Sequence, residues 1–262
     1  MAFGRYKIKS ERVRYQPESQ DPYTISRSKL DRFLECPRCF WLEARYGIGR
    51  PDTPPFTLNN AVDELFKKEF DTYRAQGKPH PLMEKYGIDA IPYAHPDLDV
   101  WRDALRRGIA YHHKPTNIIL RGGIDDVWIN PQGEIHVVDY KATAGKDKIT
   151  LDDEWKIAYK RQVEVYQWLF RQNGFTVSPV AYFVYANGQN GRTSLSGKLE
   201  FDITILPYEG DTSWVEPALE DLKKALVSSK APPVSATCEY CAYREHAGKT
   251  LLALHRAHQK GK

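Results

Sequence analysis

The sequence lacks the long apolar runs that membrane-spanning helices need. None of its apolar stretches approaches the roughly 18 residues of a transmembrane helix. Residues 1–20 are basic and have no apolar centre, so they do not resemble a secretory signal peptide. We therefore expect a cytoplasmic protein that has no membrane partner.

Cysteine is scarce, and its placement argues against an ordinary disulfide framework. The chain has 4 cysteines in two pairs of identical spacing, Cys36 with Cys39 and Cys238 with Cys241. In a cytoplasmic protein, paired C-x-x-C spacing favours a bound metal ion or cluster over disulfide bonds. Since one pair lies near each end, a shared ligand would join the two ends of the chain.

The sequence also has no strong excess of positive or negative charge. It contains 38 Lys and Arg residues and 34 Asp and Glu residues, which gives a net charge of +4. This balance permits a polyanionic partner without requiring one. The length fits one large domain with appendages. Residues 1–23 have no apolar periodicity and are expected to form a flexible N-terminal arm, which leaves 24–262 as a single domain.

Apolar periodicity predicts helices towards both ends and strands in the middle. The expected helices cover 29–46, capped by Ser26, then 57–76, about 97–112, 152–174, 213–228 and a basic C-terminal segment. The expected strands cover 117–129, 134–142, 177–186 and 199–206, with a short one near 148–151. This order predicts an α/β fold with a mixed β-sheet core at about 57–210, flanked by helices. The Cys-bearing segments, 29–46 and 235–245, lie outside that core.

Charged residues interrupt what otherwise reads as a buried hairpin. Alternation along the strand 134–142 puts Asp139 and Lys141 on one face. The turn at 130–133 folds the preceding strand back, so that Asp125 falls opposite Asp139 or the residue before it. Two neighbouring carboxylates repel each other unless a cation lies between them. Carboxylate oxygens are suitable ligands for Mg²⁺ or Mn²⁺. Asp126 points to the opposite face and is not expected to be a ligand.

The (D/E)-x-K tripeptide by itself carries little information. It also occurs at Glu154–Lys156 and Asp221–Lys223, in predicted helices where residues i and i+2 do not face each other. The copy at Asp139–Lys141 is equally consistent with a salt bridge at a strand end. Only the acid across the hairpin favours a metal site, in which Lys141 would orient or deprotonate a water.

Three motifs in this order resemble the PD-(D/E)XK nuclease superfamily, and most closely its RecB-like branch, which includes CRISPR-associated exonucleases. They are the GGID segment ending at Asp125, the DYK segment 139–141 and the QVEVY segment 162–166. The resemblance implies a restriction-endonuclease-like core and a Mg²⁺- or Mn²⁺-dependent deoxyribonuclease, with exonuclease or endonuclease action left open. Its DNA substrate would be single-stranded or have single-stranded ends, and protein partners in a DNA-processing complex are possible.

The resemblance also assigns roles to particular residues. Asp125, Asp139 and the Tyr140 carbonyl would ligate the metal, and Lys141 would serve the attacking water. Gln162 and Tyr166 would position the site and contact DNA, although their spacing also fits a helix face with a packed tyrosine. Glu164 is expected to be solvated. A basic path for the substrate is expected at Lys146, Lys148, Lys160 and Arg161.

The chain departs from the RecB-like pattern in two places. The metal-binding histidine of the upstream helix is missing, and Asp63 or Glu64 stands roughly in its place. Some RecB-like nucleases hold a 4Fe–4S cluster with one N-terminal and three C-terminal cysteines, whereas this chain has two and two. We expect the 4Fe–4S cluster, which the resemblance favours, with Zn²⁺, which the symmetrical spacing favours, as the alternative; four reduced cysteines that bind nothing are a third reading. These departures leave two alternatives to an active nuclease. The protein is either a nuclease fold that binds DNA without cutting it, or a zinc-stabilised protein that binds a partner.

Overall fold

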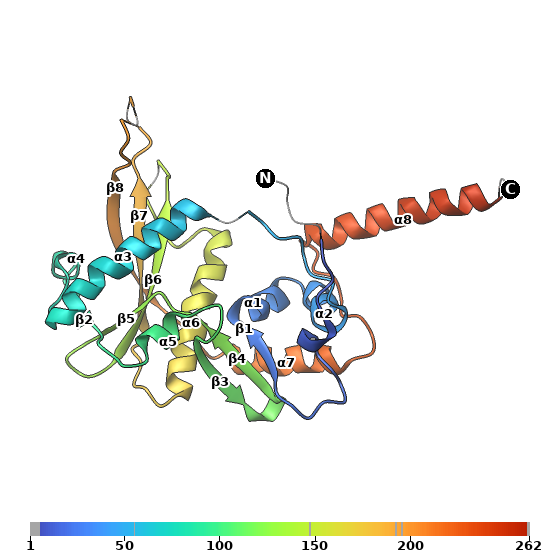
Figure 1. Cartoon of the computed structure of the whole chain (residues 1–262), viewed down its shortest axis with the longest axis horizontal. Helices are drawn as coiled ribbons and strands as arrows, with labels where there is room; N and C mark the ends of the chain where they lie inside the picture. The colour runs from blue at the N-terminus through green and yellow to red at the C-terminus, as the bar shows by residue number, and fades with distance from the viewer. Residues whose placement is uncertain (1–5, 55, 147, 192, 195, 261–262) are drawn as a thin grey trace.

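Two mixed β-sheets form the centre of the molecule, and helices cover them (Figure 1). The computed structural model describes residues 6–54, 56–146, 148–191, 193–194 and 196–260. The five-stranded sheet has the order β2 (Ile91–Pro92), β5 (Asp126–Ile129), β6 (Ile135–Thr143), β7 (Val180–Gly188) and β8 (Phe201–Glu209). The three-stranded sheet has the order β1 (Tyr23–Ser26), β4 (Ile118–Gly122) and β3 (Ile109–His113). The predicted fold class is confirmed.

Eight α-helices surround the sheets in the described residues. They are α1 (Arg27–Glu35), α2 (Pro37–Tyr46), α3 (Thr57–Gln76), α4 (Pro81–Lys85), α5 (Leu98–Arg102), α6 (Ile157–Gln172), α7 (Val215–Val227) and α8 (Glu239–Lys260). Short 3₁₀ turns occupy Glu11–Val13, Lys114–Thr116 and Glu154–Lys156. Within the part of the chain that the structure describes, no helix has the length and apolar character needed to cross a bilayer.

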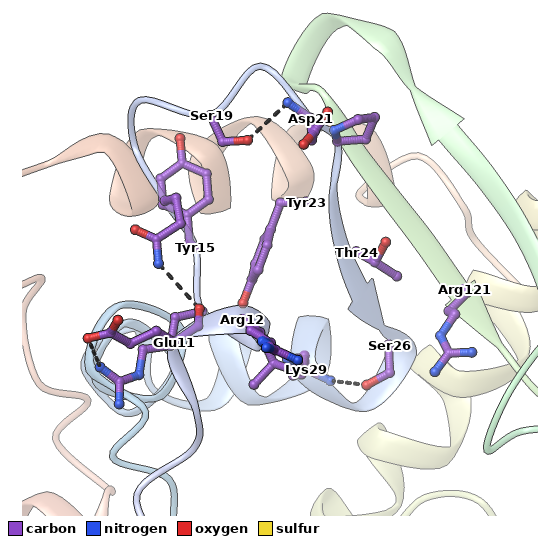
Figure 2. A pocket seen from close by; sticks show the side chains of 14 residues that line it. Glu11, Arg12, Tyr15, Ser19, Asp21, Tyr23, Thr24, Ser26, Lys29 and Arg121 are labelled. Atoms are coloured by element: carbon purple, nitrogen blue, oxygen red, sulfur yellow. Dashed lines mark hydrogen bonds and ion pairs between the residues drawn. The ribbon is translucent and has the colours of Figure 1, made fainter.

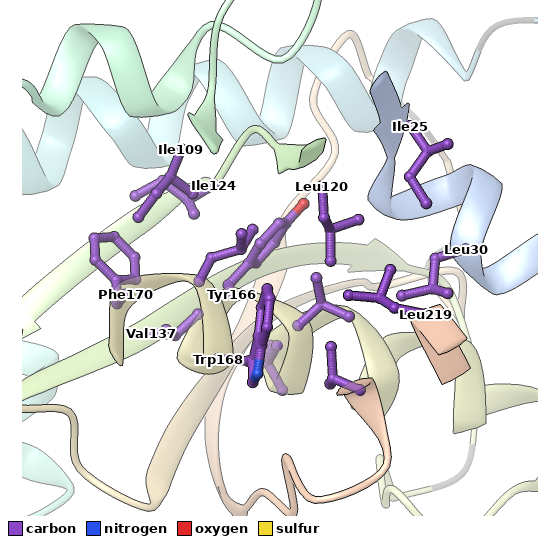
Figure 3. Packing of buried hydrophobic residues seen from close by; sticks show 14 of the residues in the cluster. Ile25, Leu30, Ile109, Leu120, Ile124, Val137, Tyr166, Trp168, Phe170 and Leu219 are labelled. Carbon is purple, nitrogen blue, oxygen red and sulfur yellow. The ribbon is translucent and has the colours of Figure 1, made fainter. Parts of the chain in front are cut away.

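The five-stranded sheet is buried on both faces. On one face, Phe66 and Phe70 of α3 pack with Trp128 and Val138 of the hairpin. On the other, the apolar side chains of α6 pack with Val137 and Phe183 (Figure 3). Because side chains alternate along β6, Asp139 and Lys141 lie on the α6 side. Asp139 and Lys141 therefore lie on a strand that is held between two layers of helix.

The predicted helix 29–46 is two helices. Ser26 caps α1 as expected, because its side chain accepts a hydrogen bond from the backbone N–H of Lys29. The helix then ends at Cys36, which has extended angles of φ −158° and ψ 102°. Pro37 follows, and a proline excludes the residue before it from the helical region. The break separates the helix that carries Ser26 from the helix that carries Cys39.

Two further sequence predictions are wrong in the middle of the chain. The expected helix near 97–112 is only α5 followed by β3, since Gly108 adopts a left-handed φ of 77° that interrupts a helix. Residues 148–151 form no strand. By contrast, α3 ends where predicted, at Gly77 with φ 62°.

The expected strand 117–129 is split between the two sheets. Its first part is β4 of the three-stranded sheet and its second part is β5 of the five-stranded sheet. The connection is tight, because a Cβ atom on Gly123 would lie 2.5 Å from the Cα atom of Ala104. The chain therefore crosses from one sheet to the other at 122–125, and Asp125 lies at the end of that crossing.

Part of the segment that was expected to be a flexible arm packs against α2. The backbone N–H of Lys9 donates to the Gly47 carbonyl at 3.0 Å, and that of Tyr15 donates to the Ala44 carbonyl at 2.8 Å. The Tyr15 ring is buried and meets the Tyr23 ring edge to face, with centroids 5.3 Å apart. Residues 6–15 are thus held to the folded domain.

Substituting Gly123 with alanine should destabilise the protein. The added methyl group would overlap the backbone of Ala104, which cannot move aside as a flexible side chain can. We expect a loss of about 1–3 kcal/mol in the free energy of unfolding, measured by urea denaturation. Gly145→Ala is the matched control, because no atom lies within 4 Å of a Cβ there. Equal stability of the two variants would contradict a tight crossing.

Candidate active site

Acidic side chains gather in a pocket of about 310 Å³ beside the end of the crossing. Its walls come from the first turns of α3, from β6 and from the start of α6. The lining includes Asp63, Asp125, Tyr140, Lys141 and Gln162. Most of the residues that the sequence motifs selected therefore meet in one place.

The hairpin register brings Asp125 next to Asp139. Asp126 pairs with Val138, so the residue before it lies level with the next position of β6. The Asp125 carboxylate accepts a hydrogen bond from the backbone N–H of Tyr140 at 2.9 Å, which fixes it at the strand end. The expected register, with Asp125 opposite Asp139 or its neighbour, agrees with this arrangement.

Asp139 lies behind the pocket lining, beside Asp125, and is the most deeply buried of the three acids, with an exposed fraction of 1%. Gln162 donates to one of its carboxylate oxygens at 2.8 Å, and Lys141 forms an ion pair with the other. Burial raises the pKa of Asp139 to about 7; Lys141 acts against this shift, and the Asp125 carboxylate adds to it. The two acids repel each other in the absence of a cation.

Of the two candidates for the missing histidine, only Asp63 faces the pocket. One of its oxygens accepts from Lys67 at 2.6 Å, while the other is buried without a hydrogen-bond partner. Lys67 also lies 4.0 Å from Asp125 and so joins the two acids. Burial, followed by repulsion from Asp125, raises the pKa of Asp63. Glu64 is exposed, because neighbouring residues of a helix point about 100° apart.

Lys141 is surrounded by negative charge and by an aromatic ring. Burial by itself lowers its pKa, but the carboxylates of Asp139 and Asp125 outweigh this effect and raise it. Its ammonium group lies 4.7 Å from the centre of the Tyr159 ring. A lysine held in the charged form is better suited to stabilise an anion than to accept a proton.

The donor set of this pocket fits a hard divalent cation. It offers carboxylate oxygens that repel one another and one buried oxygen, on Asp63, that lacks a partner. Mg²⁺ and Mn²⁺ prefer such oxygen ligands, and a double positive charge would remove the repulsion. In this structure, the ammonium groups of Lys67 and Lys141 partly neutralise the carboxylates of Asp63, Asp125 and Asp139.

The structure places two α6 residues differently from the sequence analysis. Glu164, expected to be solvated, is buried and accepts hydrogen bonds from the Tyr208 hydroxyl and, at 2.7 Å, from the Trp214 indole. The reason is that residues 163–170 of α6 are all buried. Tyr166 lies in the core beside Leu120 and Trp168 (Figure 3), against the backbone of Gly122. It supports the crossing that carries Asp125 and does not line the pocket.

Only some of the basic side chains that were expected to contact the substrate's phosphates are free of other contacts. Arg161 pairs with Asp31 at 3.3 Å, and the Lys160 ammonium lies 5.7 Å from the centre of the Tyr208 ring. Lys146 and Lys148 are exposed. The side chains of Lys160 and Arg161 are thus engaged with protein groups.

The four cysteines meet at a second centre, where the N-terminus of α2 approaches the start of α8. Their sulfur atoms all lie within 4.8 Å of one another, and the shortest separations are 3.5 Å, from Cys39 to both Cys238 and Cys241. All four are buried, and Arg244 donates to the Cys241 sulfur at 3.0 Å. The expected joining of the two Cys-bearing segments is confirmed.

A family model described as the PD-(D/E)XK nuclease superfamily matches residues 54–246. The chain belongs to this superfamily. The match runs from the start of α3 into α8 and so includes all three motifs and the second cysteine pair. No curated protein shows significant similarity to the chain.

Membership of the PD-(D/E)XK superfamily implies a nucleic-acid substrate and a metal-dependent nuclease site. Proteins of this superfamily usually hydrolyse phosphodiester bonds with the help of divalent metal ions. The four-cysteine cluster adds a second place where this member could bind metal.

The sequence analysis missed a buried ion-pair network behind the PD-(D/E)XK site. Asp126 is fully buried and pairs with Arg74 of α3 and, at 3.0 Å, with Arg102 of α5. It also accepts from the Tyr140 hydroxyl at 2.6 Å. Arg74 occupies the helix position that continues the buried series of Val62, Phe66 and Phe70 at intervals of four. An arginine on an apolar stripe was the signal that a buried acid must lie opposite.

Replacing Asp126 with asparagine should lower the free energy of unfolding and leave the acids that line the pocket, Asp63 and Asp125, in place. The two guanidinium groups would lose their anionic partner in a buried setting, at a cost of about 3–5 kcal/mol. Asp125→Asn is the matched comparison, since it removes repulsion from Asp63 and Asp139 and should keep or increase stability. Thermal unfolding of both variants measures the difference. A larger loss for Asp125→Asn would contradict these assignments.

Proposed function

We propose that this protein is a metal-dependent deoxyribonuclease of the RecB-like branch. The observation that carries the proposal is the convergence of Asp63 and Asp125 in the pocket with Lys141, and of Asp139 directly behind them, where Gln162 and Lys141 both contact it. Charges of this kind are costly to bury unless they serve a bound cation. The motifs favour a role in DNA repair, recombination, or phage or CRISPR-type DNA processing, together with protein partners.

Each pocket residue has a separate task in this proposal. Asp125, Asp139 and the Tyr140 carbonyl would ligate Mg²⁺ or Mn²⁺, and Asp63 would take the place of the missing histidine. The bound ion would supply Lewis acidity to the attacking water and to the phosphate. Gln162 holds the Asp139 carboxylate in position through its hydrogen bond. Lys141 contributes positive charge for the phosphate as negative charge develops on it.

The surroundings of the pocket favour a strand whose bases are accessible. Phe56, which lines the pocket, is 72% exposed, and Trp155 near the start of α6 is 61% exposed. Exposed aromatic rings can stack on unpaired bases, and each stacked base contributes about 1–3 kcal/mol to the binding free energy. This supports DNA that is single-stranded or has single-stranded ends as the substrate.

Nuclease activity with Mn²⁺ on single-stranded and double-stranded DNA tests the proposal. Asp139→Asn should abolish cleavage, and Gln162→Leu should lower its rate by about 10–100-fold, because Gln162 acts through Asp139. Asp221→Asn is the matched control, since it alters another D-x-K tripeptide on the exposed side of α7. Wild-type protein that binds DNA and cleaves none would instead favour the DNA-binding reading, which the missing histidine motivates.

For the four cysteines, we infer a single Zn²⁺ ion in place of a 4Fe–4S cluster. Tetrahedral zinc with bonds of about 2.3 Å sets its sulfur ligands about 3.8 Å apart. The closest separations here, 3.5 and 3.7 Å, are near that value. In a cluster each cysteine binds a different iron, so the sulfurs would stand much further apart. Zinc would hold α2 against α8.

The metal content of the anaerobically purified protein tests this inference. We expect one zinc per chain and no absorbance band near about 400 nm, where iron–sulfur proteins absorb. Cys39→Ser should release the metal and lower the melting temperature, because the ion joins distant parts of the chain. Stoichiometric iron together with that absorbance band would show that the centre is a cluster.

A further inference from the structure

A second and larger cavity lies next to the start of the sheet crossing, where Arg121 lines it. Its volume is about 770 Å³, and it is enclosed by residues 11–24, the first turn of α1 and the end of β4 (Figure 2). None of the three sequence motifs contributes to it. The cavity forms because Tyr15 holds the N-terminal segment against α2, while β1 pairs with β4.

Lys29 is a partly buried cation in this cavity that has no acidic partner. Among the described residues its ammonium group makes one contact, with the face of the Tyr23 ring at 5.7 Å from the ring centre. Burial, joined by the cations Lys9, Arg32 and Arg121, lowers the pKa of Lys29 to about 8. A buried charge without a counter-ion is costly, so the surroundings of Lys29 favour an incoming anion.

The other charged groups of the cavity are mainly positive. Arg12, Arg14, Lys29 and Arg121 line it, against only Glu11 and Asp21. Arg121 donates to the carbonyls of Leu105 and Arg107, at 3.2 and 3.1 Å, and forms no ion pair in the described chain. Its charge is therefore not neutralised by a carboxylate.

The hydroxyl of Tyr23 provides an independent sign of a missing polar ligand. It is buried and has no hydrogen-bond partner among the described residues. Burial raises the pKa of Tyr23 to about 12, so the group remains a donor. An unpaired buried hydroxyl costs free energy that a bound acceptor would recover.

The cavity and the candidate active site adjoin the same short segment. Arg121 lines the cavity and Asp125 lines the active-site pocket, four residues apart in the chain. Four residues span at most about 14 Å. That length corresponds to about four nucleotides at the 3.4 Å rise of a strand in duplex DNA, and to fewer nucleotides of an extended single strand. One strand could therefore reach both places.

We propose that this cavity binds a phosphate group of the nucleic-acid strand whose scissile bond lies in the active site. The proposal rests on the proposed nuclease function. Lys29 and Arg121 supply the positive charge, and the Tyr23 hydroxyl donates a hydrogen bond. The phosphate is either a terminal group or one of the internal phosphodiesters of the strand.

Binding of single-stranded DNA without catalysis tests the proposal. The probe is a 3′-fluorescein-labelled oligonucleotide with either a 5′-phosphate or a 5′-hydroxyl group, titrated without added Mg²⁺ or Mn²⁺ and without a chelator, and followed by anisotropy. Lys29→Gln should weaken binding about tenfold, the worth of one charge-assisted contact. It should also reduce the salt dependence, the slope of log K against log salt concentration, by about 0.7. Tyr23→Phe should weaken binding about threefold.

The controls separate a lost contact from a damaged fold. Lys29→Gln removes a charge that has no acidic partner in the described chain, and Tyr23→Phe removes a buried hydroxyl that has no hydrogen-bond partner there, so both variants should melt at or near the wild-type temperature. Lys78→Gln, which alters an exposed lysine beyond the end of α3, should leave binding unchanged. A loss confined to the 5′-phosphorylated probe would identify a terminal phosphate, and an equal loss for both probes would identify an internal one. Unchanged affinity of Lys29→Gln would overturn the proposal.

The same experiment distinguishes this proposal from the nuclease proposal. Cleavage by the wild type together with unchanged binding by Lys29→Gln would remove only the phosphate cavity. Weakened binding by Lys29→Gln in a protein that never cleaves would support the cavity and remove only the catalytic function.

Discussion

The passage of the chain from the three-stranded to the five-stranded sheet at residues 122–125 constrains everything around it. Space there is so limited that Gly123 meets the backbone of Ala104 and Gly122 meets the ring of Tyr166. The backbone N–H of Tyr140 then binds the Asp125 carboxylate, so that the acid cannot swing away from Asp139. A close pair of carboxylates needs a rigid support, because their repulsion would otherwise separate them.

Helix α3 places charges of opposite sign beside two neighbouring acids of the hairpin, Asp126 and Asp125, with opposite consequences. Near its end, Arg74 enters the core and is matched by the buried carboxylate of Asp126, which makes that pair part of the fold. Near its start, Asp63 adds a further negative charge beside Asp125, with only lysine ammonium groups to balance it. Of two acids adjacent in the sequence, Asp126 therefore belongs to the buried ion-pair network and Asp125 belongs to the proposed metal site.

The extensions at the two ends of the chain meet at the cysteine centre, while α8 continues away from the domain (Figure 1). Because α2 also anchors the segment around Tyr15, a metal at the cysteines would steady one wall of the cavity that contains Lys29. The active-site pocket and this cavity both adjoin the sheet crossing, the pocket through Asp125 and the cavity through Arg121. We propose that a cation binds in the first and a phosphate group in the second.

The sequence by itself determined the elements whose signals are local. Alternation along β6, the turn after β5 and the spacing of the three motifs predicted the hairpin, its register and the PD-(D/E)XK superfamily, and the C-x-x-C pairs predicted the joined ends. These features depend on neighbours a few residues apart. Only the tertiary structure decided that one predicted strand belongs to two sheets, that Asp63 and not Glu64 faces the pocket, and that Glu164 and Tyr166 are buried. Those outcomes depend on which distant surfaces pack together, and a local pattern carries no information about the partner that buries it.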